Sequence, residues 1–212
     1  QDIFIKNLAA LTETKITANP ALDTSPHYSP DGRYIAYAAM KKVGYEADRE
    51  CLILYDRKKK THTRLTDSLD RSVGEILWAP GSRDIYFTVR EQGRSSIYRA
   101  NLKGDIKLIT KTGYNTGISL TPDGRKLVFR RSFNHLPYEI FTLSLKSGRV
   151  EQLTFTNAGF LKEFDLPRLE DFRFTGAEGT KVHGFIQRPP GFDPAKKYPV
   201  VLCIHGGPQN MW

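Results

Sequence analysis

The sequence lacks several features that would place a protein in a class at once. Its 212 residues include two cysteines, Cys51 and Cys203, and neither has a second cysteine or a histidine nearby at zinc-finger spacing. No apolar run approaches the ~20 residues that a membrane span requires, and the opening QDIFIKNL is unlike a signal peptide. We therefore expect no disulfide framework, no cofactor, no bound metal and no membrane partner, and we expect Cys203 to be a small buried apolar residue.

Charge of one sign is in excess but is not concentrated. The formal net charge is +9, and the one dense basic run spans residues 57–60, between two strand-like segments. Such a run is more typical of a solvated hairpin tip than of a binding patch. No nucleic-acid partner is expected.

An internal repeat organises most of the chain. A turn with proline at 30, 80 and 122 recurs, each time inside a run rich in tyrosine, isoleucine, valine and phenylalanine. A second marker, leucine or isoleucine followed by threonine, ends each unit at 17, 66, 110 and 154, in steps of 49, 44 and 44 residues. Repeats of roughly 40 to 50 residues are typical of propeller blades.

Each repeat predicts four short antiparallel strands. The Pro-Asp-Gly or Pro-Gly-Ser turn predicts a hairpin, and a third and a fourth strand follow it. The expected third strands are 52–55, 97–100 and 140–143, and the expected fourth strands are 63–66, 106–109 and 150–153. Four such strands make one β-propeller blade.

The first residues predict the end of a preceding blade. Residues 3–5 and 15–17 are expected to be its last two strands. Three blades and a remnant cannot close a ring, so we expect further blades upstream, with an open three-blade solenoid as the alternative.

The pattern changes after Phe155. We predict a hairpin of 170–175 with 182–186, and then a strand at 200–204, because five consecutive apolar residues suit a strand buried on both faces. His205-Gly206-Gly207-Pro208 follows. In α/β-hydrolases a glycine loop after the third strand supplies an oxyanion donor, whereas the alternative is an ordinary strand-ending turn. We therefore predict a mostly β fold, with a partial propeller over 1–160 and the N-terminal strands of an α/β-hydrolase domain over 161–212.

These motifs together resemble one family. The Ser-Pro-Asp-Gly-Arg repeats are similar to those of the prolyl oligopeptidase family and of TolB-like proteins, and RPPGFDPAKKYPVVLCIHGGPQ resembles the propeller-to-hydrolase junction of the acylaminoacyl-peptidase branch. The resemblance implies cleavage of short peptides by a Ser, Asp and His triad, with the propeller gating access and the Gly206-Gly207 loop forming the oxyanion hole. The Gly-x-Ser-x-Gly elbow is absent, so the triad is expected downstream of residue 212 and none of the five histidines is expected to be its base. His205 is expected to orient the loop.

A loop in the first blade is the candidate for substrate recognition. An enzyme that releases dipeptides must bind a free α-ammonium, for which a carboxylate is the natural partner. We predict that Glu46 or Asp48 contacts this amine and that Tyr45 lines the pocket. The alternative is a solvated loop in which one of the two carboxylates pairs with Arg49.

Two other functions fit parts of the sequence. A TolB-like propeller without catalysis is one, although it needs no buried strand and glycine loop after the blades. An esterase of the same hydrolase fold is the other. Oligomeric state stays open, a homo-oligomer included, and a periplasmic or secreted location is favoured over the cytoplasm.

Overall fold

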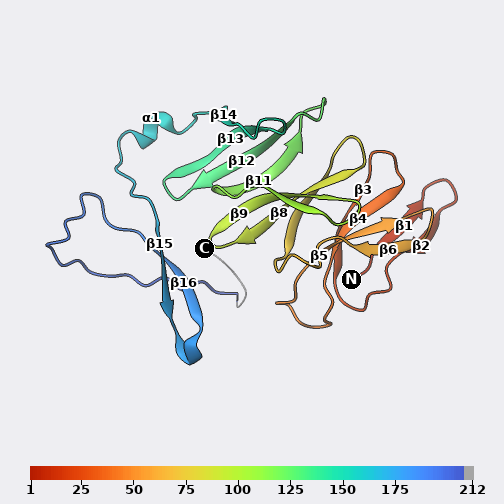
Figure 1. Cartoon of the computed structure of the whole chain (residues 1–212), viewed down its shortest axis with the longest axis horizontal. Coiled ribbons are helices and arrows are strands. Elements are labelled where there is room, and N and C mark those ends of the chain that lie inside the picture. Colours follow the sequence, from red (N-terminus) through yellow and green to blue (C-terminus); the bar gives the residue numbers. More distant parts are fainter. Residues whose placement is uncertain (208–212) are drawn as a thin grey trace.

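The computed structural model describes residues 1–207 and consists mostly of antiparallel strands (Figure 1). Two short strands open the chain, β1 (Phe4–Asn7) and β2 (Thr12–Lys15), which pair with each other. Three four-stranded units follow: β3 (Asp23–Tyr28), β4 (Tyr34–Ala39), β5 (Cys51–Asp56) and β6 (Thr61–Arg64); β7 (Val73–Trp78), β8 (Asp84–Glu91), β9 (Arg94–Asn101) and β10 (Ile106–Thr110); β11 (Tyr114–Leu120), β12 (Lys126–Phe133), β13 (Leu136–Ser144) and β14 (Val150–Gln152). The repeat read from the sequence therefore corresponds to repeated four-stranded units, which we call blades one, two and three.

The proline turns join the first two strands of each blade, as predicted. In blade one, the amide of Gly32 donates to the Ser29 carbonyl at 2.8 Å, and Gly32 has a φ of +68°. The Ser29 hydroxyl donates to Asp31 at 2.6 Å, which closes the turn from the side-chain side. Glycine meets the positive φ without steric cost.

The repeated threonine has a structural explanation. Its hydroxyl accepts a backbone N–H in or next to the strand that pairs with the preceding strand, in pairs with distances of 3.1, 2.9 and 2.8 Å: Thr17 with Ile3, Thr66 with Leu52, and Thr154 with Ile140. In blade two the pairing shifts between Leu108 and Thr110, and the Thr110 hydroxyl accepts from Arg131 instead. The marker is thus a side chain that completes the ladder where the fourth strand ends.

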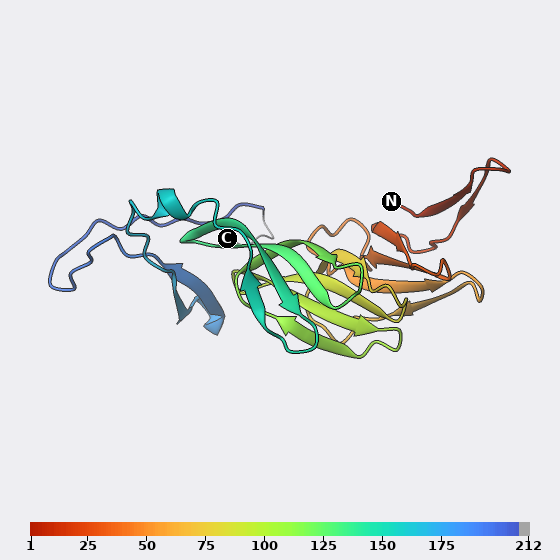
Figure 2. The same cartoon turned by 90° about the horizontal axis from the view of Figure 1, so that it is seen from above.

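Successive blades lie side by side (Figure 2). Buried apolar side chains pack between them. One core cluster joins blades one and two, around Leu52, Trp78 and Phe87. A second joins blades two and three, around Ile97 and Phe129, and a third lies between β1–β2 and blade one. This arrangement matches propeller blades, and the described residues do not form a closed ring.

Polar contacts also cross between blades. The Trp78 indole donates to the His27 carbonyl at 3.0 Å, and the Asp31 amide donates to the Ser82 hydroxyl at 3.1 Å. Blades two and three are further joined by a short parallel bridge in which Tyr114 lies opposite Ser95. The blades are therefore fixed relative to one another by hydrogen bonds as well as by apolar packing.

The segment after blade three has little regular structure. A short helix, α1 (Ala158–Leu161), precedes the predicted hairpin, which consists of β15 (Glu170–Thr175) and β16 (Lys181–Ile186) around a 3₁₀ turn, η1 (Ala177–Gly179). Figure 1 shows this segment extending away from the blades. Among the described residues, no helix is long and apolar enough to cross a membrane.

The predicted strand at 200–204 is wrong for this structure. Residues 198–206 form no strand, and Val200 and Leu202 are 90% and 80% exposed. Cys203 is likewise exposed, whereas the sequence predicted a buried thiol. A strand buried on both faces needs paired strands beside it and layers above and below, and the described residues supply none of these to 200–204.

Candidate functional site

The loop between β4 and β5 carries the three predicted substrate residues. Asp48 Oδ2 accepts hydrogen bonds from the amides of Lys41 and Lys42, both at 2.6 Å, and these bonds hold the pKa of Asp48 below its ordinary value. The Asp48 amide donates to the Tyr45 carbonyl at 2.9 Å. Asp48 therefore closes the loop on itself, an arrangement that the sequence did not predict.

Tyr45 and Glu46 occupy the outer part of this loop. The Tyr45 ring is half exposed, and the ammonium of Lys42 lies 5.0 Å from its centroid. Glu46 and Asp48 both line a cavity of about 480 Å³. The structure thus brings Glu46 and Asp48 to one hollow, with Tyr45 beside them.

The cavity is strongly charged. It is enclosed by the β4–β5 loop, by the connection from blade one to blade two, and by β8, and its lining residues are Met40, Glu46, Ala47, Asp48, Arg49, Glu50, Asp70, Arg71, Ser72 and Arg90. Carboxylates and guanidinium groups alternate around it. Such a lining suits a small ligand that carries both a positive and a negative group.

Glu50 is a lining residue that sequence reasoning missed. Burial raises the pKa of its carboxyl above the ordinary value. Its backbone is fixed, because its amide donates to the Ser72 hydroxyl at 3.2 Å and its carbonyl accepts from Val73 at 2.9 Å. The signal in the sequence is the density of acidic residues in 46–50, of which only Glu46 and Asp48 were predicted to bind the substrate.

Arg49 contacts the connection between blades one and two. Its guanidinium donates to the carbonyls of Leu69 and Asp67, and lies 3.8 Å from the Asp67 carboxylate. It thereby ties the β4–β5 loop to the connection between blades one and two. The lining of the cavity is braced from both sides.

The β4–β5 loop lies at the end of blade one where its second and third strands are connected. Each connection between the second and third strands of a blade is at this end, and two of them touch the segment that follows the propeller-like part. Arg94 pairs with Asp171 at 3.1 Å, and Asn134 donates to the Pro167 carbonyl at 2.9 Å. The charged cavity is therefore on the face toward the C-terminal segment.

The glycine loop at 206–207 lies at the end of the described residues. A Cβ at Gly206 would meet nothing within 4 Å, and the His205 ring is 3.1 Å from the Gly206 carbonyl. Gly207 has a φ of +149°. Pro208 lies outside the described residues, and the oxyanion role of Gly206 and Gly207 stays a prediction.

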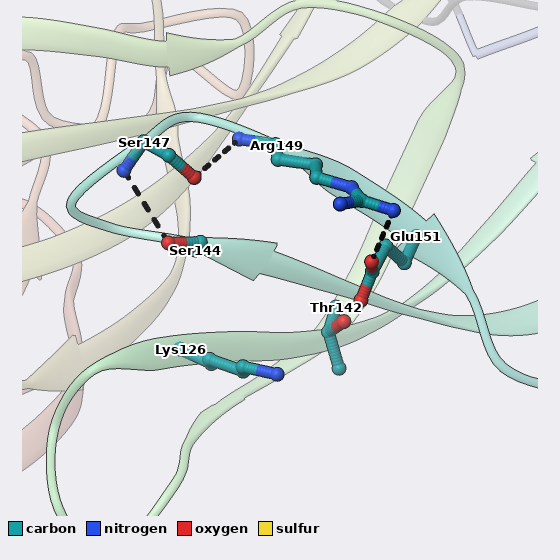
Figure 3. Close-up of a pocket in the computed structure, with 6 residues that line it drawn as sticks. All are labelled: Lys126, Thr142, Ser144, Ser147, Arg149 and Glu151. Atoms are coloured by element: carbon teal, nitrogen blue, oxygen red, sulfur yellow. Dashed lines mark hydrogen bonds and ion pairs between the residues drawn. The ribbon is translucent and has the colours of Figure 1, made fainter.

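A second, smaller cavity is a surface feature of blade three. It measures about 130 Å³ and is lined by Lys126, Thr142, Ser144, Ser147, Arg149 and Glu151 (Figure 3). The Ser144 hydroxyl accepts from the Ser147 amide, and Arg149 pairs with Glu151 at 2.9 Å. No histidine is among its lining residues, so it holds no Ser-His pair of the kind that activates a nucleophile. Across residues 1–207, no group of three or more histidine, cysteine or acidic side chains is placed to hold a metal.

Comparison with known proteins shows that the chain is similar to one segment of several peptidases. No family model matches it. It is 31% identical over 211 residues to dipeptidyl-peptidase 5 of Porphyromonas gingivalis, covering 99% of this chain and 31% of that protein. It is 30% identical over 196 residues to dipeptidyl-peptidase 5 of Aspergillus fumigatus, covering 89% of this chain and 27% of that protein. The chain thus spans less than a third of these relatives.

Solved structures share the fold. The acylaminoacyl peptidase of Pyrococcus horikoshii matches 89% of this chain and 28% of its own, with a TM-score of 0.72 and 20% identity. The β-propeller domain of the Trilobed protease from Pyrococcus furiosus matches 74% of this chain and 46% of its own, with a TM-score of 0.57 and 25% identity. TolB from Acinetobacter baumannii matches 90% of this chain and 44% of its own, with a TM-score of 0.55 and 22% identity. The resemblance to the dipeptidyl-peptidase five and acylaminoacyl-peptidase branch of the prolyl oligopeptidase family is thereby confirmed, and the chain is a relative of one segment of those peptidases.

Proposed function

We propose that the protein carrying this chain is a serine peptidase that removes dipeptides or acylated residues from short peptides. The observation that carries the proposal is the likeness to dipeptidyl-peptidase 5 over 99% of the chain. The blades gate access to the site, and the catalytic serine, aspartate and histidine belong to the α/β-hydrolase domain that begins within residues 161–212. The amides of the Gly206-Gly207 loop stabilise the oxyanion that forms on the scissile carbonyl, a contribution of about 3–4 kcal/mol in related chemistry.

The charged cavity supports a role in binding the substrate amine. Glu46 lines it from the outer part of the loop, next to the half-exposed ring of Tyr45. Asp48 borders the same hollow, but its Oδ2 is occupied by two backbone amides. We propose that Glu46 or Asp48 contacts the α-ammonium, that Tyr45 lies beside the bound substrate, and that the two backbone amides on Asp48 Oδ2 fix the shape of the loop. Expelling water strengthens such a charge pair.

Substitutions in the natural protein test these roles. Glu46→Gln is expected to lower kcat/KM for free-amine dipeptidyl substrates by about tenfold or more, the loss of one charge-assisted contact. Turnover of the matching N-acylated substrates should stay unchanged. Asp48→Ala is expected to lower turnover of both substrate types, because the loop loses its internal acceptor.

Asp70→Asn is the matched control. Asp70 lines the same cavity but its side chain is 96% exposed and it pairs with Arg71. Its substitution should have little effect on either substrate. Equal turnover of free-amine substrates by the Glu46→Gln variant and the unaltered protein would remove Glu46 from the site.

The likeness to TolB supports a second candidate, a propeller that binds other proteins without catalysis. A fluorophosphonate probe separates the two, because it forms a covalent bond with an activated serine only. Labelling of one serine in the natural protein supports the peptidase or an esterase of the same fold. Hydrolysis of acyl esters without hydrolysis of dipeptidyl amides would favour the esterase.

A further inference from the structure

The turn between β8 and β9 contacts the β15–β16 hairpin at two points. The Arg94 guanidinium lies 3.1 Å from Asp171 Oδ2. Beside it, the Phe185 ring lies over Gly93, so closely that a Cβ at Gly93 would sit 2.2 Å from Phe185 Cζ. Gly93 has a φ of +72°, and glycine therefore serves both the turn and the space that the ring needs.

The hairpin presents these groups on one face. Asp171 lies opposite Phe185 in the register, and Arg173 lies opposite His183. His183 Nε2 is 2.9 Å from Asp171 Oδ1, and its ring meets the Phe185 ring edge-on at 4.7 Å. His183 of the same hairpin thus contacts Asp171 Oδ1, and Arg94 of blade two contacts Oδ2. The contact with His183 orients the carboxylate toward Arg94.

The Arg94 side chain is also oriented by a contact within its own β8–β9 turn. Arg94 NH1 donates to the Gln92 carbonyl at 3.1 Å, which folds the guanidinium back over its own turn. Its side chain remains 38% exposed and that of Asp171 45% exposed. The ion pair alone is therefore weak, and the apolar contact of Phe185 with Gly93 excludes water beside it.

We infer that residues 92–94 form a latch that docks the C-terminal segment onto the blades. The latch holds β15–β16 on the face that carries the charged cavity, and it limits how far the linker at 153–169 can move. It consists of the ion pair between Arg94 and Asp171 and of the contact between the Phe185 ring and Gly93. The inference concerns docking alone and stands whether or not the protein cleaves peptides.

A charge exchange in the natural protein tests the latch. Arg94→Asp and Asp171→Arg should each accelerate chymotrypsin cleavage at Phe160 and Phe164, which are 63% and 48% exposed in the linker. The expected acceleration is about two- to fivefold, the range that one exposed ion pair supports when opening precedes cleavage. The double variant should return toward the unaltered rate, because the pair is restored with reversed sign.

Gly93→Ala tests the second contact without altering charge, and should accelerate cleavage at the same two sites. Arg125→Asp is the matched control, since Arg125 lies in a turn at the opposite end of blade three and faces Asp123 at 3.9 Å. Unchanged linker cleavage in all three single variants would overturn the latch. A double variant cleaved faster than either single charge variant would overturn the ion-pair part of it.

Discussion

Arg131 donates from Nε to Asn115 Oδ1 at 2.8 Å, and both side chains are almost fully buried, at 4% and 1% exposure. The guanidinium lies 5.0 Å from the Phe129 ring centroid and 5.2 Å from that of Phe141, and NH2 donates to the Thr110 hydroxyl at 3.1 Å. Burial lowers the pKa of Arg131 to about 10. A buried cation that has no carboxylate partner within residues 1–207 therefore joins blade three to the last strand of blade two.

Removing this guanidinium should destabilise the blades. We expect Arg131→Ala to lower the free energy of unfolding by about 2–4 kcal/mol, because it leaves a cavity and strips Asn115 of its donor. Arg131→Lys should recover only part of the loss, since an ammonium neither forks nor stacks as a guanidinium does. Arg130→Ala is the control, because Arg130 directly precedes Arg131 in the chain and is exposed. Denaturant unfolding measures the series, and equal stability of the Arg131 and Arg130 variants would contradict the role.

The strands of the blades were predicted well because the same pattern of strands and turns occurs in three successive repeats. Proline turns mark boundaries by local hydrogen bonds, as at Gly32, and local bonds can be read from local sequence. The terminal threonines bond across to another strand, as Thr66 does to Leu52, and were recognised because they recur at a regular spacing. The run at 200–204 was misread for the opposite reason. Five consecutive apolar residues are compatible with a buried strand. Whether they are buried depends on neighbouring strands and covering layers, which the run itself does not supply.

The candidate site was predicted only in part. The acids of the β4–β5 loop were found, but whether a carboxylate faces a cavity or its own backbone depends on the path of the loop. Asp48 and Glu46 look equivalent in sequence, and the two backbone amides that Asp48 Oδ2 accepts could not be predicted from it. The latch could not be predicted, because Gly93 and Phe185 are far apart in the chain and carry no shared motif.

Glu75 is expected to stabilise the contact between blades two and three. Its carboxylate accepts the amides of Gly117 and Ile118 at 2.9 and 3.0 Å, and also the Thr116 hydroxyl, all at a bulge in β11. Glu75→Ala should cost about 1.5–3 kcal/mol of unfolding free energy, the range for hydrogen bonds to a charged group. Glu75→Gln should cost less, since one oxygen still accepts.

The control for Glu75 is Glu151→Gln, which alters an exposed ion pair with Arg149 on the outer strand of blade three. Thermal or denaturant unfolding of the three variants makes the comparison. If Glu75→Ala proves no less stable than Glu151→Gln, the bulge does not depend on the carboxylate.

The repeated threonine should matter through its hydroxyl. Thr66 is fully buried and accepts the Leu52 amide at 2.9 Å. Thr66→Val keeps the shape but leaves that amide unsatisfied, at a cost of about 1–3 kcal/mol. Thr63→Val, on the exposed strand β6, should change stability by less than about 0.5 kcal/mol. Amide hydrogen exchange at Leu52 gives a local readout, and unaltered protection there in Thr66→Val would refute the proposed role.

Two aspartates should give stability opposite dependences on pH. Asp23 is 1% exposed, its Oδ1 accepts from Asn19 at 2.9 Å, and Oδ2 has no hydrogen-bond partner among the described residues. Burial raises its pKa. Its contribution to stability is therefore present at low pH and is lost as pH rises through the folded-state pKa. Asp23→Asn should stabilise the protein at pH 7 and leave it unchanged where the carboxyl is already protonated.

Asp31 should behave in the reverse way. Its Oδ1 accepts the Ser29 hydroxyl at 2.6 Å and the Arg33 amide at 3.1 Å, and these bonds lower its pKa. Its contribution is present above the unfolded-state pKa and is lost as pH falls through the folded-state value, so Asp31→Asn should destabilise at pH 7 and have little effect in acid. Unfolding is measured from about pH 2, well below the ordinary aspartate pKa, up to pH 7. Both differences should therefore grow as pH rises, with opposite signs, and a shared sign would contradict the assignment of one buried and one turn-closing carboxyl.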